Sequence, residues 1–359
     1  MDIGGAFVKA AYWDGEGGFG PLPLLPTTVY RDLDGRLLTG SEAVRLARTA
    51  PERAEAMPAR SLAEQDEMLL GGDATHPVEL VAALLTRVLR DSWPGFDRTR
   101  PDALTMVVPS DLGGTDRAVL GRAIAAAGLP EPVWVPAPVA IAAGWAARRE
   151  AHAGTLVAVC DAGATGLRFA LASVGHAEYQ PGDNIACGGA DLDEALFGLV
   201  EARTRTARPE AWKRLLDCSG PEDLRARSQL REDVTGVREA LSATTTVPLT
   251  VPGHREELLV RRNEFEEAAA QPLARAGTAL ADLMASGACP SAVLLAGGAA
   301  RTPKLAELLS RSAGGLLPEV LPDPVNAAVL GAARTHKALV ATGGGEAPYA
   351  FPEDEDLFR

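Results

Sequence analysis

The feature that most constrains the fold is a short pattern that occurs twice: an apolar run, an aspartate, a glycine-containing turn and a second apolar run. The first copy opens the sequence, where Asp2 is followed by Gly4 and Gly5, and the second lies in residues 155–174, around Asp161. A turn built on glycine lets backbone N–H groups approach phosphate oxygens closely. An aspartate at the end of a strand can hold a metal-bound water or orient water for attack on a phosphate.

A third segment, residues 291–310, has the pattern of a strand, a turn at Gly297-Gly298 and a helix. This turn could let a flat base or a ribose lie against the backbone. Any one of the three segments alone is adequately explained as a tight turn with a solvated aspartate. Three of them in this order favour a nucleotide-phosphate site, and the recurrence of the first pattern suggests two similar halves.

Strands and helices alternate between these turns, which predicts an α/β layered fold. Residues 78–92 carry apolar side chains at helical spacing, and the Asp34-Gly35 pair between two short apolar runs is a hairpin signal. The pattern predicts further helices at 41–55, within 191–243 and at 263–286, and strand character at 246–261.

Composition excludes several classes of function. The 48 acidic residues outnumber the 35 basic ones, for a net charge of −13, and no basic run favours nucleic acid. The four cysteines and five histidines show no spacing of metal ligands or disulfides. The longest uncharged stretch, residues 132–147, is shorter than the roughly 18 residues that suggest a membrane span. With no leader pattern at the start, we expect a cytoplasmic protein that binds neither nucleic acid nor membrane.

The ordered series of segments resembles the nucleotide-binding domain of the heat-shock-seventy (DnaK-like) chaperones, within the actin-like ATPase superfamily. Residues 2–15 are similar to its first phosphate loop, 161–171 to its second, 230–244 to its adenine-side helix and 294–309 to its adenosine loop. The segments that carry the rest of the resemblance are 25–53, 107–129, 135–146, 188–196 and 323–333.

This resemblance implies a two-lobed, ribonuclease-H-like α/β fold with a nucleotide cleft between the lobes. Lobe I would hold residues 1–154 and 325–342, and lobe II residues 155–324 with an upper subdomain at about 190–262; a loose acidic tail would follow at 343–359. The implied ligands are ATP or ADP with Mg²⁺, with Asp2 and Asp161 as metal-side and catalytic carboxylates and Arg60 as the lysine-like group near the phosphates. The implied nucleotide contacts are Gly4, Gly5, Ala6, Gly163, Ala164, Thr165, Arg168, Gly188, Gly189, Arg238, Ser242, Gly297, Gly298 and Arg301.

The chain also departs from the pattern of that family. Gly5-Ala6 replaces two hydroxyl residues, Arg168 replaces an aspartate that helps to hold a monovalent cation, and Ala137 replaces a glutamate that relays nucleotide state. On the adenine-side helix, Arg238-Glu239 stands where the family has Lys-Arg. We therefore expect slow or absent hydrolysis, and Arg168 to point into the cleft in place of the bound cation.

The resemblance favours an ATP-binding protein whose lobes close on nucleotide and act on an unidentified partner protein, with a co-chaperone-like factor as a further possible partner. Only Met1 precedes Asp2, so the first strand is expected to be short, and the residues after 340 are too few for a substrate-binding domain. The alternatives are a non-catalytic scaffold with the same fold and, with less support, a small-molecule kinase or an actin-like filament protein.

Overall fold

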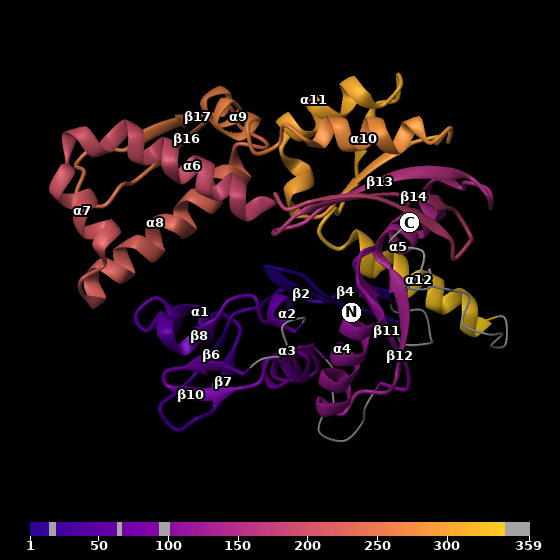
Figure 1. The fold of residues 1–359 in the computed structure, drawn as a ribbon, viewed down its shortest axis with the longest axis horizontal. Coiled ribbons are helices and arrows are strands. Elements are labelled where there is room, and N and C mark those ends of the chain that lie inside the picture. Colours follow the sequence, from indigo (N-terminus) through magenta and orange to yellow (C-terminus); the bar gives the residue numbers. More distant parts are fainter. Residues whose placement is uncertain (14–18, 63–66, 93–100, 342–359) are drawn as a thin grey trace.

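The computed structural model describes residues 1–13, 19–62, 67–92 and 101–341, and it folds into two α/β lobes (Figure 1). Each lobe is built around a mixed five-stranded sheet. The predicted α/β class is therefore confirmed. The tail at 343–359 lies outside the described residues, and the proposed lobe boundaries stay predictions.

The two sheets have the same strand order and the same strand directions. The first three strands of each are antiparallel neighbours, and two later strands continue the sheet in parallel on the other side of the first strand. The first sheet runs β5 (Leu25–Pro26), β2 (Phe7–Lys9), β1 (Asp2–Ile3), β11 (Leu104–Val108), β12 (Pro132–Pro136). The second runs β15 (Tyr179–Ile185), β14 (Leu167–Ser173), β13 (Leu156–Ala162), β18 (Val293–Ala296), β19 (Pro318–Val320).

Smaller strand groups and helices complete each lobe. The small sheets are β3 (Ala11–Trp13) with β4 (Phe19–Pro21), β6 (Val29–Arg31) with β7 (Leu37–Thr39) and β8 (Ala54–Glu55), β9 (Met68–Leu70) with β10 (Asp73–Thr75), and β16 (Thr246–Leu249) with β17 (Leu258–Arg261). The helices of the first lobe are α1 (Ser41–Ala47), α2 (Pro58–Ser61), α3 (Pro77–Ser92) and α4 (Gly114–Ala126). Those of the second are α6 (Gly189–Thr204), α7 (Pro209–Asp217), α8 (Pro221–Ala240), α9 (Arg262–Ala270), α10 (Ala276–Ala285) and α11 (Pro303–Ser312).

Two further helices, α5 (Ala137–Arg149) and α12 (Ala327–Ala341), lie between the sheets (Figure 1). They share one apolar core with both sheets, which includes Val107 of β11, Ile141 of α5 and Val159 of β13. The helix backbones nearly touch, because a Cβ built on Gly331 would lie 1.8 Å from the carbonyl oxygen of Ala140. After the second lobe, the chain thus returns to the first, and α12 completes the helical layer between the two sheets.

Most element predictions hold, and two need correction. The helix at 78–92 is α3, and the Asp34-Gly35 hairpin is the β6–β7 turn, with Gly35 at φ +82°. The helix expected over 41–55 ends at Ala47, because the residue before Pro51 is disfavoured in helical conformation. The helix expected over 263–286 is two helices, α9 and α10, interrupted around Pro272, whose missing N–H cannot continue the helix.

Nothing in the described part of the chain forms a helix both long and apolar enough to cross a bilayer.

Candidate functional site

The first half of the site is the turn between β1 and β2, here called the first loop (residues 4–6). It is closed by a hydrogen bond from the Gly4 amide to the Phe7 carbonyl at 3.0 Å. Across the hairpin Asp2 faces Lys9, and the Lys9 Nζ lies 2.5 Å from Asp2 Oδ2. Asp2, Gly4, Gly5 and Ala6 therefore lie together on one hairpin, which also carries Lys9.

The second half is the turn between β13 and β14, here called the second loop (residues 163–166). It is closed in the same way, by a hydrogen bond from the Gly163 amide to the Gly166 carbonyl at 2.9 Å. Asp161 faces Arg168 across this hairpin, at the same seven-residue spacing as Asp2 and Lys9. Each lobe therefore contributes one hairpin of the same design.

The two loops meet face to face. A Cβ built on Gly5 would lie 2.6 Å from Thr165 Cγ2, so only glycine fits at this contact without a shift of the threonine. Within the described residues, the amides of Gly5, Ala6, Ala164 and Thr165 donate to no acceptor, although none of these residues is buried. Accessible, unpaired N–H groups on two facing turns form a candidate anion site.

Charged side chains lie on the strands that carry the two loops. The pKa of Asp161 is raised, first because its carboxyl is buried and then because Asp2 and Asp111 add negative charge, which Lys9 and Arg168 only partly offset. The pKa of Lys9 is also raised: burial alone would lower it, but the carboxylates of Asp2 and Asp161 outweigh that effect. Asp161 is thus a carboxyl that accepts a proton more readily than usual, beside a lysine that stays charged.

Arg168 makes its hydrogen bond with the opposite lobe. Its Nε donates to Asp111 Oδ1 at 2.8 Å, and Asn184 Nδ2 donates to Asp111 Oδ2. Asp111 follows β11 of the first lobe, while Arg168 and Asn184 lie on β14 and β15 of the second. The Asp111 carboxylate therefore connects the lobes beside the second loop, and the role of Arg168 in place of a bound cation stays a prediction.

Gly188 and Gly189, expected among the nucleotide contacts, hold the start of α6 against the second loop. The Gly189 amide donates to the Gly163 carbonyl at 3.0 Å, and the Gly188 amide to Asp191 Oδ2 at 2.8 Å. A Cβ on Gly188 would lie 2.5 Å from the Gly166 nitrogen. In this structure the two amides therefore support the second loop and leave no N–H for a ligand.

The Gly297-Gly298 turn lies directly against the strand of the second loop. Gly297 has φ +85°, its amide donates to the Pro324 carbonyl at 2.6 Å, and a Cβ there would lie 2.2 Å from the Ala162 oxygen. A Cβ on Gly298, in contrast, would meet nothing within 4 Å in the described structure. Arg301, three residues on, is exposed. The turn therefore packs its backbone against the end of β13, which leads into the second loop, and leaves open space beside Gly298.

The residues expected on the adenosine are engaged within the protein. Arg238 of α8 is nearly buried and pairs with Asp193 of α6 at 2.5 Å, close to Gly189. The Ser242 hydroxyl donates to the Glu239 carbonyl at 2.6 Å. Their roles toward adenosine stay predictions.

Arg60 lies on α2 with an exposed side chain. This helix begins two residues after Ala56, and the Thr27 hydroxyl lies within hydrogen-bonding distance of the carbonyls of both Ala56 (2.8 Å) and Gly5 (3.0 Å). Arg60 is thus near the first loop in the fold, and its predicted contact with phosphate remains a prediction.

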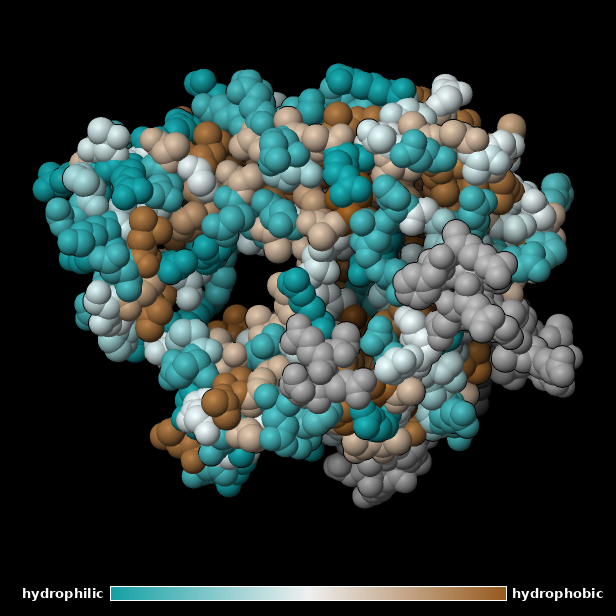
Figure 2. Space-filling view, viewed as in Figure 1, coloured by the Kyte–Doolittle hydropathy of each residue, from teal (hydrophilic) through white to brown (hydrophobic). Residues whose placement is uncertain are grey.

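An opening separates the outer parts of the lobes, as the left half of Figure 2 shows. It is bridged by Arg48, just after α1, whose Nε donates to Glu232 Oε1 of α8 at 2.8 Å while its Nη2 donates to Oε2. Protein side chains therefore connect the lobes at both ends, at Arg48–Glu232 and at Arg168–Asp111.

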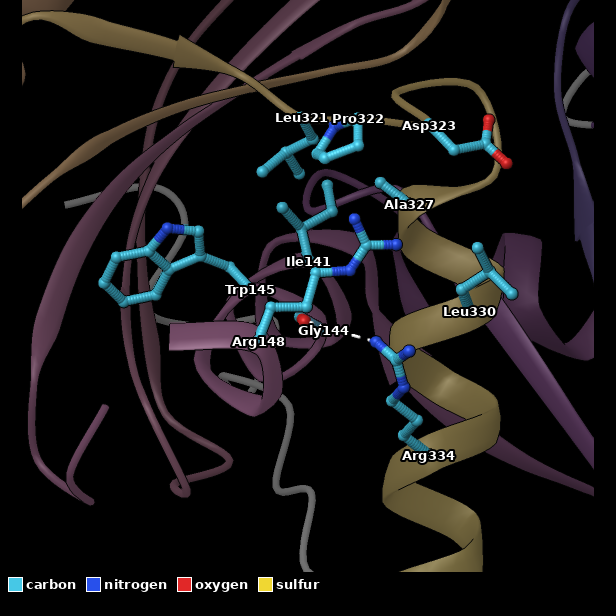
Figure 3. A pocket seen from close by; sticks show the side chains of 10 residues that line it. All are labelled: Ile141, Gly144, Trp145, Arg148, Leu321, Pro322, Asp323, Ala327, Leu330 and Arg334. Atoms are coloured by element: carbon cyan, nitrogen blue, oxygen red, sulfur yellow. Dashed lines mark hydrogen bonds between the residues drawn. The ribbon is translucent and has the colours of Figure 1, made fainter. Parts of the chain in front are cut away.

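A separate cavity lies between α5 and α12 (Figure 3). Arg148 and Arg334 reach into it from the two helices, with Asp323 on the far side, and Arg334 donates to the Gly144 carbonyl at 3.4 Å. No residue that lines this cavity belongs to the predicted site, so we place the candidate site at the facing loops.

No protein-family model matches the chain, and no curated protein is significantly similar to it. The candidate site therefore rests on the two hairpins themselves.

The resemblance implies Mg²⁺, and the residues at the site do not fit it well. In the described chain no three acidic, histidine or cysteine side chains cluster as metal ligands. Mg²⁺ can use as few as one or two carboxylates together with phosphate oxygens. Here, however, the expected ligand Asp2 is already paired with the Lys9 ammonium. We derive no step through a metal.

Reasoning from the sequence missed Lys9 and Asp111. The signal for Lys9 was present, since a basic residue follows each aspartate at a spacing of seven. Asp111 carried no such signal, because it reaches Arg168 only through the packing of the two lobes.

Proposed function

We propose that this chain binds ATP or ADP through the first and second loops, with slow hydrolysis or none, and that closure of its lobes around the nucleotide acts on a partner protein. The single observation that carries the proposal is the face-to-face contact of two hairpin turns with unpaired amides, at Gly5-Ala6 and Ala164-Thr165. The strand order shared by the two sheets supports an actin-like, ribonuclease-H-like fold, in which a nucleotide lies between the lobes.

In this proposal the amides hold the phosphates, and the open space at Gly298 admits the nucleoside. Asp161 is the group that orients water, because its raised pKa makes it a better proton acceptor than an ordinary aspartate. Neither Ala137 nor Arg168 offers a carboxylate, so hydrolysis stays slow.

Titration calorimetry with ATP, ADP and AMP tests the proposal, with thermal melting as a second measurement. A ligand that binds only the folded state adds about 2.7 kcal/mol at a hundredfold excess over its Kd. We expect ATP and ADP to raise the melting temperature and AMP to act weakly, because it lacks the phosphates that the loops hold. Millimolar ATP and ADP that give neither heat nor a shift would refute the proposal.

The second candidate is a scaffold that uses the same fold without nucleotide. Its specific support is that Arg48–Glu232 and Arg168–Asp111 already join the lobes through protein side chains. A scaffold keeps its partner binding when Gly5 is changed to Val, whereas a nucleotide-driven protein loses its response to ATP.

A further inference from the structure

Lys9 is the only charged residue of the β1–β2 hairpin besides Asp2, and the proposed nucleotide contacts do not include it. The side chains of Lys9 and Asp2 are 18% and 14% exposed, so their 2.5 Å ion pair is mostly withdrawn from solvent. A charge pair of this kind is weakly screened, and removal of one partner leaves the other uncompensated.

The ammonium lies against the first loop itself. A Cβ built on Gly4 would lie 3.4 Å from both Cε and Nζ of Lys9. The next two residues, Gly5 and Ala6, carry the unpaired amides. The positive charge therefore lies against the residue that directly precedes those N–H groups in the first loop.

Lys9 also influences the second hairpin. Asp161 and Arg168 are among the charges that act on Lys9, and Lys9 in turn acts on Asp161. The ammonium of Lys9, paired with Asp2 of the first hairpin, thus also interacts electrostatically with Asp161 of the second.

We propose that Lys9 supplies the positive charge at the phosphates that a divalent metal would otherwise supply, so that this site binds nucleoside di- and triphosphates without Mg²⁺. The inference rests on the proposed function, because it concerns how that same site holds its ligand.

The chemistry of lysine fits this role. An ammonium group has three donors, so Lys9 can keep its bond to Asp2 and donate to a phosphate oxygen at the same time. Lysine is a common point-charge partner of phosphate. Arg168 adds a second fixed cation nearby, held in place by Asp111.

The experiment measures ADP and ATP affinity by calorimetry in excess EDTA and in excess MgCl₂ at matched ionic strength. For the wild type we expect the two affinities to agree within about threefold. Lys9→Met, which keeps the chain length and removes the charge, should weaken binding in EDTA by at least about tenfold. Lys213→Met, at an exposed site on α7, is the matched control and should bind like the wild type.

Asp2→Asn/Lys9→Met removes both charges and so leaves no unpaired charge that could destabilise the fold. Melting curves of every variant distinguish a loss of folding from a loss of binding. We expect the double variant to melt close to the wild type and still to lose the EDTA affinity. Strong wild-type binding only in MgCl₂ would overturn the inference and leave the proposed function standing. Lys9→Met binding as tightly as the wild type in EDTA would also overturn it, and no binding in either buffer would overturn both proposals.

Discussion

The β1–β2 and β13–β14 hairpins share one design but use their basic residue differently. Each has an aspartate at the end of its first strand, a glycine turn with the same closing hydrogen bond, and a basic residue opposite the aspartate. Lys9 pairs inside its own hairpin, with Asp2, whereas Arg168 pairs across the lobes, with Asp111.

The difference follows from the reach and the surroundings of the two side chains. The guanidinium of Arg168 is a planar fork on a long stem, and Asp111 and Asn184 lie beside it. The ammonium of Lys9 is a compact point charge held over the first loop. In the first hairpin, Lys9 therefore neutralises the aspartate of the same hairpin. In the second, Arg168 pairs with Asp111 of the opposite lobe, and the pKa of Asp161 is raised.

The largest expected effect concerns the folding stability of the two hairpins. Lys9→Met should lower the free energy of unfolding by about 2–3 kcal/mol, since it strands the mostly buried Asp2 carboxylate. Arg168→Met should cost less than about 1 kcal/mol, because Arg168 and Asp111 are more exposed and Asn184 stays bonded to Asp111. Urea unfolding at pH 7 measures the free energy of unfolding of both variants. Equal losses would contradict the proposed difference between the two hairpins.

The contact between the two loops gives the next effect. Gly5→Ala should weaken ATP affinity by roughly tenfold, because the new methyl group collides with Thr165 Cγ2 and pushes the loops apart. Thr165→Ser removes that methyl group and keeps the hydroxyl, so Gly5→Ala/Thr165→Ser should recover most of the affinity. Calorimetry of the two single variants and the double variant measures their ATP affinities. Purely additive losses of affinity would contradict a direct contact between the loops.

The cross-lobe pairs should have a smaller effect, on rate. Asp111→Ala frees Arg168 and Asn184, and Arg48→Met removes the bridge to Glu232, so each should speed nucleotide release by a few fold. The exposed Asp102→Ala is the control and should leave release unchanged. Stopped-flow displacement of a fluorescent nucleotide measures the rate, and a slower release in either variant would contradict the bridging role.

The smallest effect is the pH dependence of stability that Asp161 causes. A carboxyl whose folded pKa is raised contributes stability below its unfolded pKa of about 3.9, and loses it as the pH rises through the folded pKa. Asp161 is such a group, so Asp161→Asn should gain stability relative to the wild type between acid pH and pH 7. Asp2→Asn, which removes the partner of Lys9, should lose stability at pH 7. Unfolding curves of Asp161→Asn and the wild type at several pH values measure the effect, and a stability difference that falls as the pH rises would contradict it.

How far the sequence predicts the site depends on whether a feature is local. Asp2, Gly4, Asp161 and Gly163 could be placed on two matching turns because an aspartate and a glycine turn follow each other closely in the sequence. Gly188 and Gly189 were expected among the nucleotide contacts, whereas in the structure their amides donate to Asp191 and Gly163, which only the packing of α6 reveals.

The same reasoning applies to the fold. The order of strands and helices followed from apolar periodicity, as α3 shows. The errors at 41–55 and 263–286 came from giving periodicity more weight than Pro51 and Pro272. The pairing of Arg238 with Asp193 joins α8 to α6, 45 positions apart, and no local pattern predicts it.

The return of α12 to the first lobe also governs the order in which the chain can fold as it is synthesised. Its buried Val329 and Ala332 pack into the same core as Ile141 of α5, and Gly331 meets α5 at backbone distance. Until residues 327–341 have left the ribosome, that surface of α5 has no cover, although everything else in the first lobe has been made. Domains generally fold from the N-terminus as they emerge. Here the core around α5 is complete only when residues 327–341 have been made, so the first lobe reaches its final packing after the second lobe has been synthesised.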